Sequence, residues 1–157
     1  MHIGMVGLGK MGMNLVANMR DHDIEVTAFD LNDKAREAVG QYGAKAVASL
    51  DALVMSLASP RIIWSMVPAG KPTEATISQL AKLLRPDDIV IDGGTSGGMA
   101  GARADGNFMI GGDKAIFNKI EPLFKAIAAK GGYLYTGPAG SGHYLKMVHN
   151  GIEYGMM

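Results

Sequence analysis

The sequence predicts an α/β fold, a doubly wound and mostly parallel sheet of the Rossmann type with helices on both faces. Short apolar runs alternate with segments of helical periodicity along the chain. A glycine-rich turn joins the first apolar run to the first helical segment, as in dinucleotide-binding βαβ units. The length of 157 residues suits one domain. We expect a dinucleotide-binding domain over residues 1–138 and the start of a further helix over residues 139–157.

The expected elements follow from the hydrophobic period of each segment. Strands are expected over residues 3–6, 24–29, 45–47, 61–67, 88–92, 107–110 and 133–135. Helices are expected over residues 10–20, 33–42, 50–57, 73–84 and 113–128, with a final helix from Ser141. Asn32 is a candidate N-cap of the second helix. Because Met156 and Met157 still fit the helical pattern, we expect the final helix to continue beyond them.

Composition excludes several classes of function. Fifteen basic and fifteen acidic residues cancel without forming a block of like charge, which argues against nucleic acid or a membrane as the partner. The absence of cysteine excludes disulfides, thiolate chemistry and cysteine-ligated metal. The N-terminus lacks the basic region of a signal peptide, and no apolar run approaches the length of a membrane span. We expect a cytoplasmic protein that acts on a small molecule.

A glycine motif between the first strand and the first helix predicts a dinucleotide cofactor. Gly7 permits the turn, Gly9 lets the backbone approach a pyrophosphate, and Gly12 lets the helix pack against the strand. The N-terminus of the helix favours the phosphates. The expected cofactor-binding residues of this motif are Gly7, Leu8, Gly9, Lys10, Met11 and Gly12.

Asp30 predicts that the cofactor is NAD rather than NADP. It ends the second strand, 18 residues after Gly12 (30 − 12), where an acid binds the ribose hydroxyls. A carboxylate there repels a 2′-phosphate, and the residues that follow, Leu31 and Asn32, include no arginine.

Two further loops are candidate binding segments. Val67, Pro68 and Ala69 lie at the end of a strand whose carboxyl end is expected to line the cofactor crevice, although a plain loop explains them equally well. The backbone amides of the glycine-rich loop at residues 95–101 and the Ser96 hydroxyl can hold a carboxylate or phosphate. A flexible surface loop is the alternative.

The final helix carries four polar residues at positions i, i+3, i+4 and i+7, which form one stripe. They are Lys146, His149, Asn150 and Glu153. Such a set suits proton transfer to and from a polar substrate, whereas a solvated helix face would contain more Glu and Lys and fewer His and Asn.

Five motifs occur in order: Gly-Leu-Gly-Lys-Met-Gly-Met-Asn-Leu, Met-Val-Pro-Ala-Gly, Val-Ile-Asp-Gly-Gly, Thr-Ser-Gly-Gly and Lys-Met-Val-His-Asn-Gly-Ile-Glu-Tyr-Gly. Together they resemble 6-phosphogluconate dehydrogenase (decarboxylating), in particular its NAD-preferring bacterial branch. The resemblance covers essentially the whole chain. The last motif is highly specific, and the others are shared with the wider group of β-hydroxyacid dehydrogenases.

The resemblance implies a reaction of the pentose phosphate pathway or of gluconate utilization. NAD would take a hydride from C3 of 6-phosphogluconate, Lys146 would accept the proton of the C3 hydroxyl, and CO2 would leave the resulting β-keto acid. Glu153 would then protonate C1 to give ribulose 5-phosphate, and no metal is required. By the same resemblance, the substrate would be held by Ser96, Gly97, Gly98, His149, Asn150 and, at its phosphate, Tyr154.

The chain departs from the family pattern in two places. Gly94 runs directly into Thr95, where the family has a crossover, so either the crossover is deleted or the sequence omits residues there; we expect the second. The family also has an all-α C-terminal domain that forms a homo-oligomer. We therefore expect the 157-residue chain to bind NAD but to turn over poorly alone.

Two rival functions remain open from the sequence. A 3-hydroxyisobutyrate-type dehydrogenase shares the fold, the glycine motif and a catalytic lysine, but it does not decarboxylate its substrate. A non-catalytic NAD-binding module is the other alternative. Loss of CO2 from the substrate separates the first rival from the expected enzyme.

Overall fold

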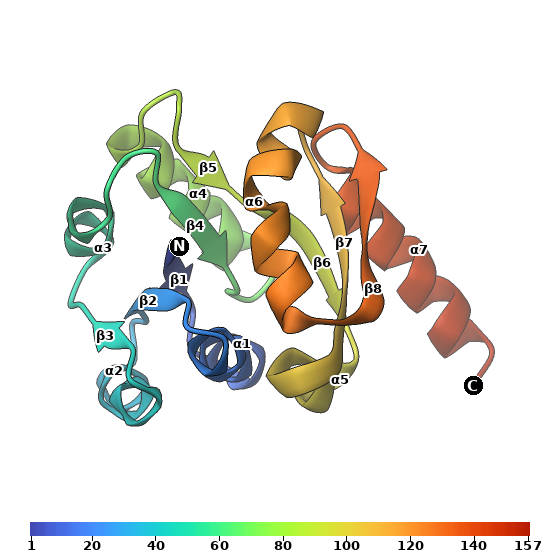
Figure 1. The fold of residues 1–157 in the computed structure, drawn as a ribbon, viewed down its shortest axis with the longest axis horizontal. Coiled ribbons are helices and arrows are strands. Elements are labelled where there is room, and N and C mark those ends of the chain that lie inside the picture. The colour runs from blue at the N-terminus through green and yellow to red at the C-terminus, as the bar shows by residue number, and fades with distance from the viewer. The chain divides into compact units, whose positions relative to one another are not determined.

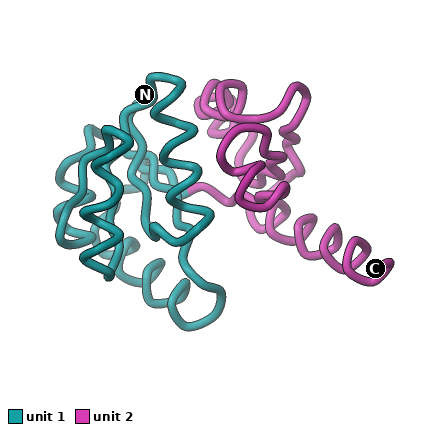
Figure 2. Tube along the Cα trace, turned by 90° about the horizontal axis from the view of Figure 1, so that it is seen from below, with its two compact units in different colours: residues 1–90 teal, residues 91–157 magenta.

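The computed structural model describes residues 1–157, and the chain divides into two compact units, Met1–Val90 and Ile91–Met157 (Figure 2). Each unit has its own sheet. The division expected at residue 138 stays a prediction. None of the helices combines the length and the apolar character needed to cross a bilayer.

The first unit is a parallel α/β sheet. Its elements are β1 (His2–Val6), α1 (Lys10–Asp21), β2 (Glu25–Phe29), α2 (Asp33–Val39), the 3-10 turn η1 (Gly40–Tyr42), β3 (Lys45–Ala46), α3 (Leu50–Ser56), β4 (Ile62–Ser65), α4 (Lys71–Leu83) and β5 (Ile89–Val90). The five strands are all parallel and lie in the order β3-β2-β1-β4-β5 (Figure 1). This order, which reverses direction between β1 and β4, is that of a doubly wound nucleotide-binding sheet.

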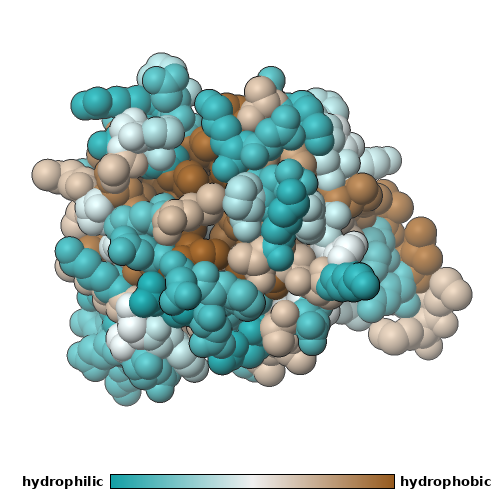
Figure 3. Space-filling view, viewed as in Figure 1, coloured by the Kyte–Doolittle hydropathy of each residue, from teal (hydrophilic) through white to brown (hydrophobic).

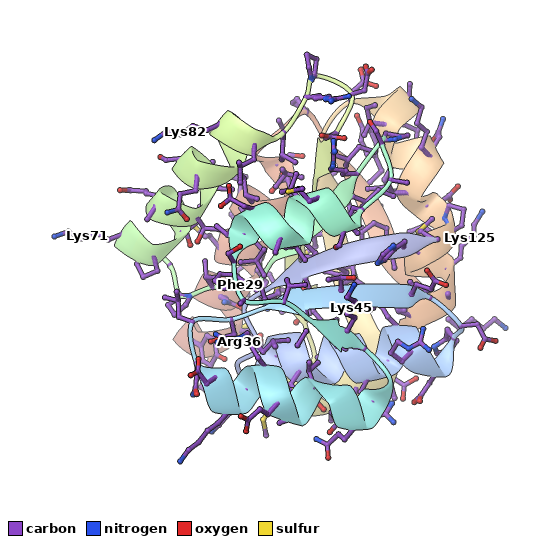
Figure 4. All side chains as sticks on the ribbon, turned by 90° about the vertical axis from the view of Figure 1, so that its left-hand side faces the viewer. Phe29, Arg36, Lys45, Lys71, Lys82 and Lys125 are labelled. Atoms are coloured by element: carbon purple, nitrogen blue, oxygen red, sulfur yellow. The ribbon has the colours of Figure 1, made fainter.

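Helices cover both faces of this sheet, with α1 and α2 on one side and α3 and α4 on the other (Figure 4). The side chain of Asn32 caps α2 as predicted, because its Oδ1 accepts a hydrogen bond of 3.0 Å from the Lys34 amide. Burial of apolar side chains between α3, α4 and the sheet stabilises the unit. That core consists of Val6, Phe29, Leu50, Leu53, Val54, Leu57, Ile63 and Leu80.

The second unit is a small three-stranded sheet between two long helices. Its elements are β6 (Asp92–Ser96), the short helix α5 (Gly98–Ala100), the π-helical turn η2 (Gly101–Asp105), β7 (Gly106–Gly111), α6 (Lys114–Ile127), β8 (Ala128–Gly137) and α7 (Ser141–Gly155). Phe117 and Phe124 of α6 pack against Tyr133 and Tyr135 of β8, and Phe124 also packs against Phe108 of β7. Helix α7 packs against β6 and β7.

Two predicted strands are clearly wrong in their extent. The strand expected over residues 133–135 is the longer β8, which runs from Ala128 to Gly137. The strand expected over residues 88–92 ends at Val90, and Asp92 begins β6 in the other sheet. Thr95 and Ser96, expected in a loop, belong to β6, which pairs antiparallel with β7. The connection from Gly97 to Asp105 has nine residues (105 − 97 + 1). A parallel pair needs a crossover of about a dozen residues or more, so β6 must run antiparallel.

Asp88 links the chain segments that precede β4 and β5. Its carboxylate accepts hydrogen bonds from the amides of Arg61 (2.7 Å) and Arg85 (2.9 Å), and it pairs with the Arg61 guanidinium at 3.0 Å. Burial alone would raise the pKa of the Asp88 carboxyl. The amides of Arg85 and Arg61 and the Arg61 side chain outweigh burial and lower this pKa below its ordinary value of 3.8.

Replacing Asp88 with asparagine is expected to lower the free energy of unfolding at pH 7 by about 3 kcal/mol, because the Arg61 guanidinium loses its charged partner. The lowered pKa means that Asp88 stabilises the fold above about pH 4 and that this contribution fades as pH falls further. Urea unfolding at pH 7 and pH 3 measures both effects. The exposed neighbour Asp87, replaced by asparagine, is the control, and equal losses in the two variants would contradict the prediction.

Candidate functional site

The glycine motif of the first unit needs glycine at two positions for steric reasons. Gly7 has a φ of +93°, and a side-chain carbon built there would lie 2.6 Å from the Met66 carbonyl oxygen. A carbon built at Gly12 would lie only 2.0 Å from the Gly7 carbonyl oxygen. A carbon built at Gly9 meets nothing within 4 Å. Gly7 and Gly12 therefore shape the turn, and Gly9 leaves open space in front of it.

The N-terminus of α1 is free to bind an anion. The helix begins at Lys10 after Gly9, with no side-chain cap and no acidic residue in its first turn. The amides of its first residues, Lys10, Met11 and Gly12, have no acceptor within the helix. The helix dipole adds a partial positive charge here. These amides and the open space at Gly9 fit the pyrophosphate of a dinucleotide.

Asp30 lies at the end of β2, next to the glycine turn. One carboxylate oxygen accepts a hydrogen bond of 2.6 Å from the Leu8 amide, and the other accepts one of 2.8 Å from the Asn32 amide. Each oxygen keeps a second lone pair for a ribose hydroxyl. Arg36 of α2, labelled in Figure 4, donates to the Asp30 carbonyl oxygen at 2.5 Å and pairs with Asp33. Arg36, the arginine beside Asp30, is thus already paired with an acidic side chain.

The segment after β4 lies next to the end of β1. The Met66 amide donates to the Val6 carbonyl oxygen at 2.7 Å, so the two strands stay paired up to this point. Val67 then packs against the core, and Pro68 and Ala69 are exposed. These residues flank the point where the strand order reverses, which is where doubly wound sheets bind their ligands.

In the second unit, three of the four residues in the polar row of α7 lie on its partly buried side. Lys146, His149 and Asn150 are half-buried, and a side-chain carbon built at Gly94 of β6 would lie 2.5 Å from the Cβ atom of Lys146. Apolar side chains lie on the outward face of the helix, visible as the brown and tan atoms along α7 in Figure 3. Exposed members of that face include Tyr144 (65%), Met147 (66%) and Ile152 (59%). Lys146, His149 and Asn150 are therefore less exposed than several apolar residues of the same helix.

The register of β6 against α7 indicates the level of Ser96 along the helix. Asp92 contacts the first turn of α7, and Gly94 contacts Lys146 one turn later. A strand rises about 3.3 Å per residue and a helix about 1.5 Å, so Ser96 lies level with about Asn150. The two other predicted loop residues follow β6 directly and are exposed: Gly97 and Gly98.

Two polar atoms of this row lack a hydrogen-bond partner although they are buried: His149 Nδ1 and Asn150 Oδ1. His149 Nδ1 lies 3.3 Å from a Glu153 carboxylate oxygen, an ion-pair distance without the angles of a hydrogen bond. Buried polar atoms in folded proteins normally have partners, so these two are suited to a ligand. Glu153 and Tyr154 lie in the last turns of α7 and are exposed.

Asp92 and His143 contact each other at the start of α7, and no role was predicted for either residue from the sequence. Burial alone would raise the pKa of the Asp92 carboxyl. Hydrogen bonds from the His143 side chain and from the amides of Gly140 and Gly142 outweigh burial, so this pKa lies below its ordinary value of 3.8. The sequence signal is indirect: α7 follows a glycine that has no capping side chain of its own.

The strand order, the glycine turn and Asp30 together define a dinucleotide-binding domain of the Rossmann type. The comparison with protein families narrows this class. The family described as the NAD binding domain of 6-phosphogluconate dehydrogenase matches residues 2–96 and 94–137. The chain belongs to this family.

Relatives of known sequence agree with this assignment. The chain is 41% identical to the YqeC protein of Bacillus subtilis (strain 168) and 39% identical to the NAD(+)-dependent, decarboxylating 6-phosphogluconate dehydrogenase of Haloferax volcanii. Both alignments cover all of this chain, which spans 61% and 60% of the respective relative. The first alignment runs over 182 residues, so it contains at least 25 positions (182 − 157) absent from this chain. The two family matches meet at residues 94–96, where the crossover was expected to be absent.

Solved structures show the same fold. The 6-phosphogluconate dehydrogenase of Plasmodium falciparum matches with a TM-score of 0.90 and 27% identity, covering 99% of this chain and 41% of that one. A 3-hydroxyisobutyrate dehydrogenase of Mycobacterium tuberculosis matches with a TM-score of 0.85 over 97% of this chain and 60% of that one. Its 23% identity supports the shared fold alone.

Proposed function

We propose that this chain belongs to an NAD-dependent enzyme that converts 6-phosphogluconate to ribulose 5-phosphate and CO2. The observation that carries the proposal is the placement of polar groups on α7: Lys146 lies against Gly94 of β6 and His149 and Asn150 are half-buried, while apolar residues of the helix are exposed. The family assignment supports the reaction, as does the name of the Haloferax volcanii relative.

The cofactor site is proposed to lie in the first unit. The amides at the start of α1 and the space at Gly9 hold the pyrophosphate, and Asp30 accepts the hydroxyls of the adenosine ribose. Val67, Pro68 and Ala69 line the same crevice. NAD, when bound, supplies the hydride acceptor for C3 of the substrate.

The substrate chemistry is proposed to lie with α7. Lys146, in its neutral form, accepts the proton of the C3 hydroxyl as C3 is oxidised, and the protonated amine then polarises the new ketone while CO2 leaves. Glu153 returns a proton to C1 of the enediol. His149 and Asn150 hold the sugar acid through their unpartnered atoms.

The remaining substrate contacts come from β6 and the end of α7. We assign to them Ser96, Gly97 and Gly98, whose hydroxyl and amides suit a carboxylate, and Tyr154, which suits the phosphate. We further propose that residues 139–157 lead into an all-α domain through which the complete enzyme forms homo-oligomers in the cytoplasm. The apolar outer face of α7, with Met147 and Ile152, supports an additional covering layer of protein.

A spectrophotometric assay tests the proposed reaction. A chain extended to the length of its relatives should form NADH with 6-phosphogluconate, and substrate labelled with ¹³C at C1 should release labelled CO2. Oxidation of 3-hydroxyisobutyrate without loss of CO2 would favour the rival dehydrogenase. NAD binding with no turnover of either substrate would favour a non-catalytic module.

Asp30 is expected to set the preference for NAD over NADP. Replacing Asp30 with alanine should weaken NAD binding to the 157-residue chain about tenfold or more, because the ribose loses its acceptor and the Leu8 amide loses its partner. NADP binding should weaken less, since the repulsion of its 2′-phosphate disappears. Calorimetric titration of both cofactors measures the two constants, with Asp87→Asn as the control. Tighter binding of NADP than NAD by the unaltered chain would overturn the role of Asp30.

A further inference from the structure

The first turn of α7 has no cap of its own. Its N-cap residue is Gly140, with a φ of +89° and no side chain to accept hydrogen bonds. The Asp92 carboxylate, 48 residues earlier, takes this role. It accepts hydrogen bonds from the amides of Gly140 (2.7 Å), Gly142 (3.3 Å) and His143 (3.3 Å). The ring Nδ1 of His143 adds a fourth contact to the same carboxylate.

These contacts are suited to hold the helix firmly. A carboxylate at a helix N-terminus satisfies amides that lack partners and complements the helix dipole. Hydrogen bonds to a charged acceptor are about twice as strong as neutral ones. The Asp92 side chain is only 18% exposed, so water competes weakly for it.

Three glycines let α7 approach the sheet closely enough for this contact. A side-chain carbon built at Gly111 would lie 2.3 Å from Asp92 Oδ2, and one built at Gly142 would lie 2.5 Å from the Met109 carbonyl oxygen. The third is Gly94, whose built carbon would meet Lys146. The contact between Gly94 and Lys146 therefore depends on the position of the first turn of α7 against the sheet.

We propose that Asp92, together with His143, is a positioning residue that seats α7 so that Lys146 lies against Gly94. His143 precedes Lys146 by one helical turn, so movement at the first turn displaces the amine directly. Ser141 and Thr136 provide a second, uncharged attachment through a hydrogen bond of 2.7 Å between their hydroxyls. The catalytic role of Lys146 in this position rests on the proposed function. The position of Lys146 against Gly94 does not.

Nuclear magnetic resonance of the 157-residue chain tests the placement without any ligand. In the Asp92→Asn variant, hydrogen exchange at the amides of residues 142–146 should be about tenfold faster, since the cap loses its charge. The nuclear Overhauser effect between the β-protons of Lys146 and the α-protons of Gly94 should weaken. Hydrogen exchange in β7 should change much less. This difference distinguishes a displacement of α7 from general destabilisation of the unit.

His143 provides a matched pair of variants. His143→Leu removes the ring donor and should weaken the same Overhauser effect, whereas His143→Asn places an amide donor near the position of Nδ1 and should restore it. Asp105→Asn, at an exposed acid outside α7, is the control. An unchanged Overhauser effect and unchanged exchange in Asp92→Asn would overturn the proposal.

A binding measurement with 6-phosphogluconate distinguishes a failure of this inference from a failure of the proposed function. If the unaltered chain binds it, Asp92→Asn should weaken that binding severalfold through Lys146, and equal binding would contradict the positioning role. If the unaltered chain does not bind it, the proposed substrate fails, and the Overhauser and exchange measurements alone decide whether Asp92 seats α7.

Discussion

The Lys146→Met variant is expected to lower kcat for 6-phosphogluconate oxidation about a thousandfold or more in a chain extended to the length of its relatives. Methionine keeps an apolar stem that packs against Gly94, but it cannot accept the proton of the C3 hydroxyl. The fold should therefore survive while the reaction stops. NADH formation at saturating substrate and NAD measures the effect.

The matched control for this variant is Lys119→Met, which removes an exposed amine from α6. It should retain full activity. NAD binding to the first unit should be equal in both variants, because the cofactor contacts proposed here involve neither lysine. A Lys146→Met enzyme with a rate within about tenfold of the unaltered one would exclude Lys146 as the base.

The Gly12→Ala variant is expected to lower the free energy of unfolding of the first unit by about 4 kcal/mol and to abolish measurable NAD binding. The added methyl carbon would lie 2.0 Å from the Gly7 carbonyl oxygen, and that atom belongs to the backbone, which cannot rotate away. Relief of the clash must separate α1 from the turn after β1. The amides that are proposed to hold the pyrophosphate would then move with the helix.

Two other glycines give controls that separate folding from binding. Gly9→Ala places its methyl carbon in open space at a φ of −64°, so stability should change little while NAD binding weakens. Gly40→Ala also meets nothing within 4 Å and should leave both properties unchanged. Thermal unfolding and calorimetric titration measure the two effects. A Gly12→Ala variant as stable as Gly40→Ala would contradict the steric argument.

Local sequence signals were sufficient for much of the fold. The glycine motif at Gly7–Gly12 predicted the turn between β1 and α1, because Gly7 and Gly12 lie where a side chain would clash with nearby backbone atoms. Asn32 was predicted to be a cap from its position alone, and its side-chain oxygen accepts a hydrogen bond from the Lys34 amide in the first turn of α2. The spacing of the polar row on α7 predicted one helix face, and three of its residues share the half-buried side.

The same local signals could not predict contacts between segments that are distant in the sequence. The cap of α7 comes from Asp92, and nothing in the local pattern connects that residue with Gly140 or His143. The end of β5 at Val90 also could not be predicted, because the apolar run continues through Ile91 without a turn signal. Pairing with β7 decides the strand to which Asp92 belongs.

Addition of 6-phosphogluconate to the ¹⁵N-labelled 157-residue chain tests most directly whether the inward face of α7 is the substrate face. We expect amide shift changes concentrated at residues 94–98, at the end of β6 and just after it, and at Lys146, His149 and Asn150, with a saturable dependence on ligand concentration. Shift changes confined to the outward residues Tyr144 and Met147, or none up to the solubility of the ligand, would contradict it.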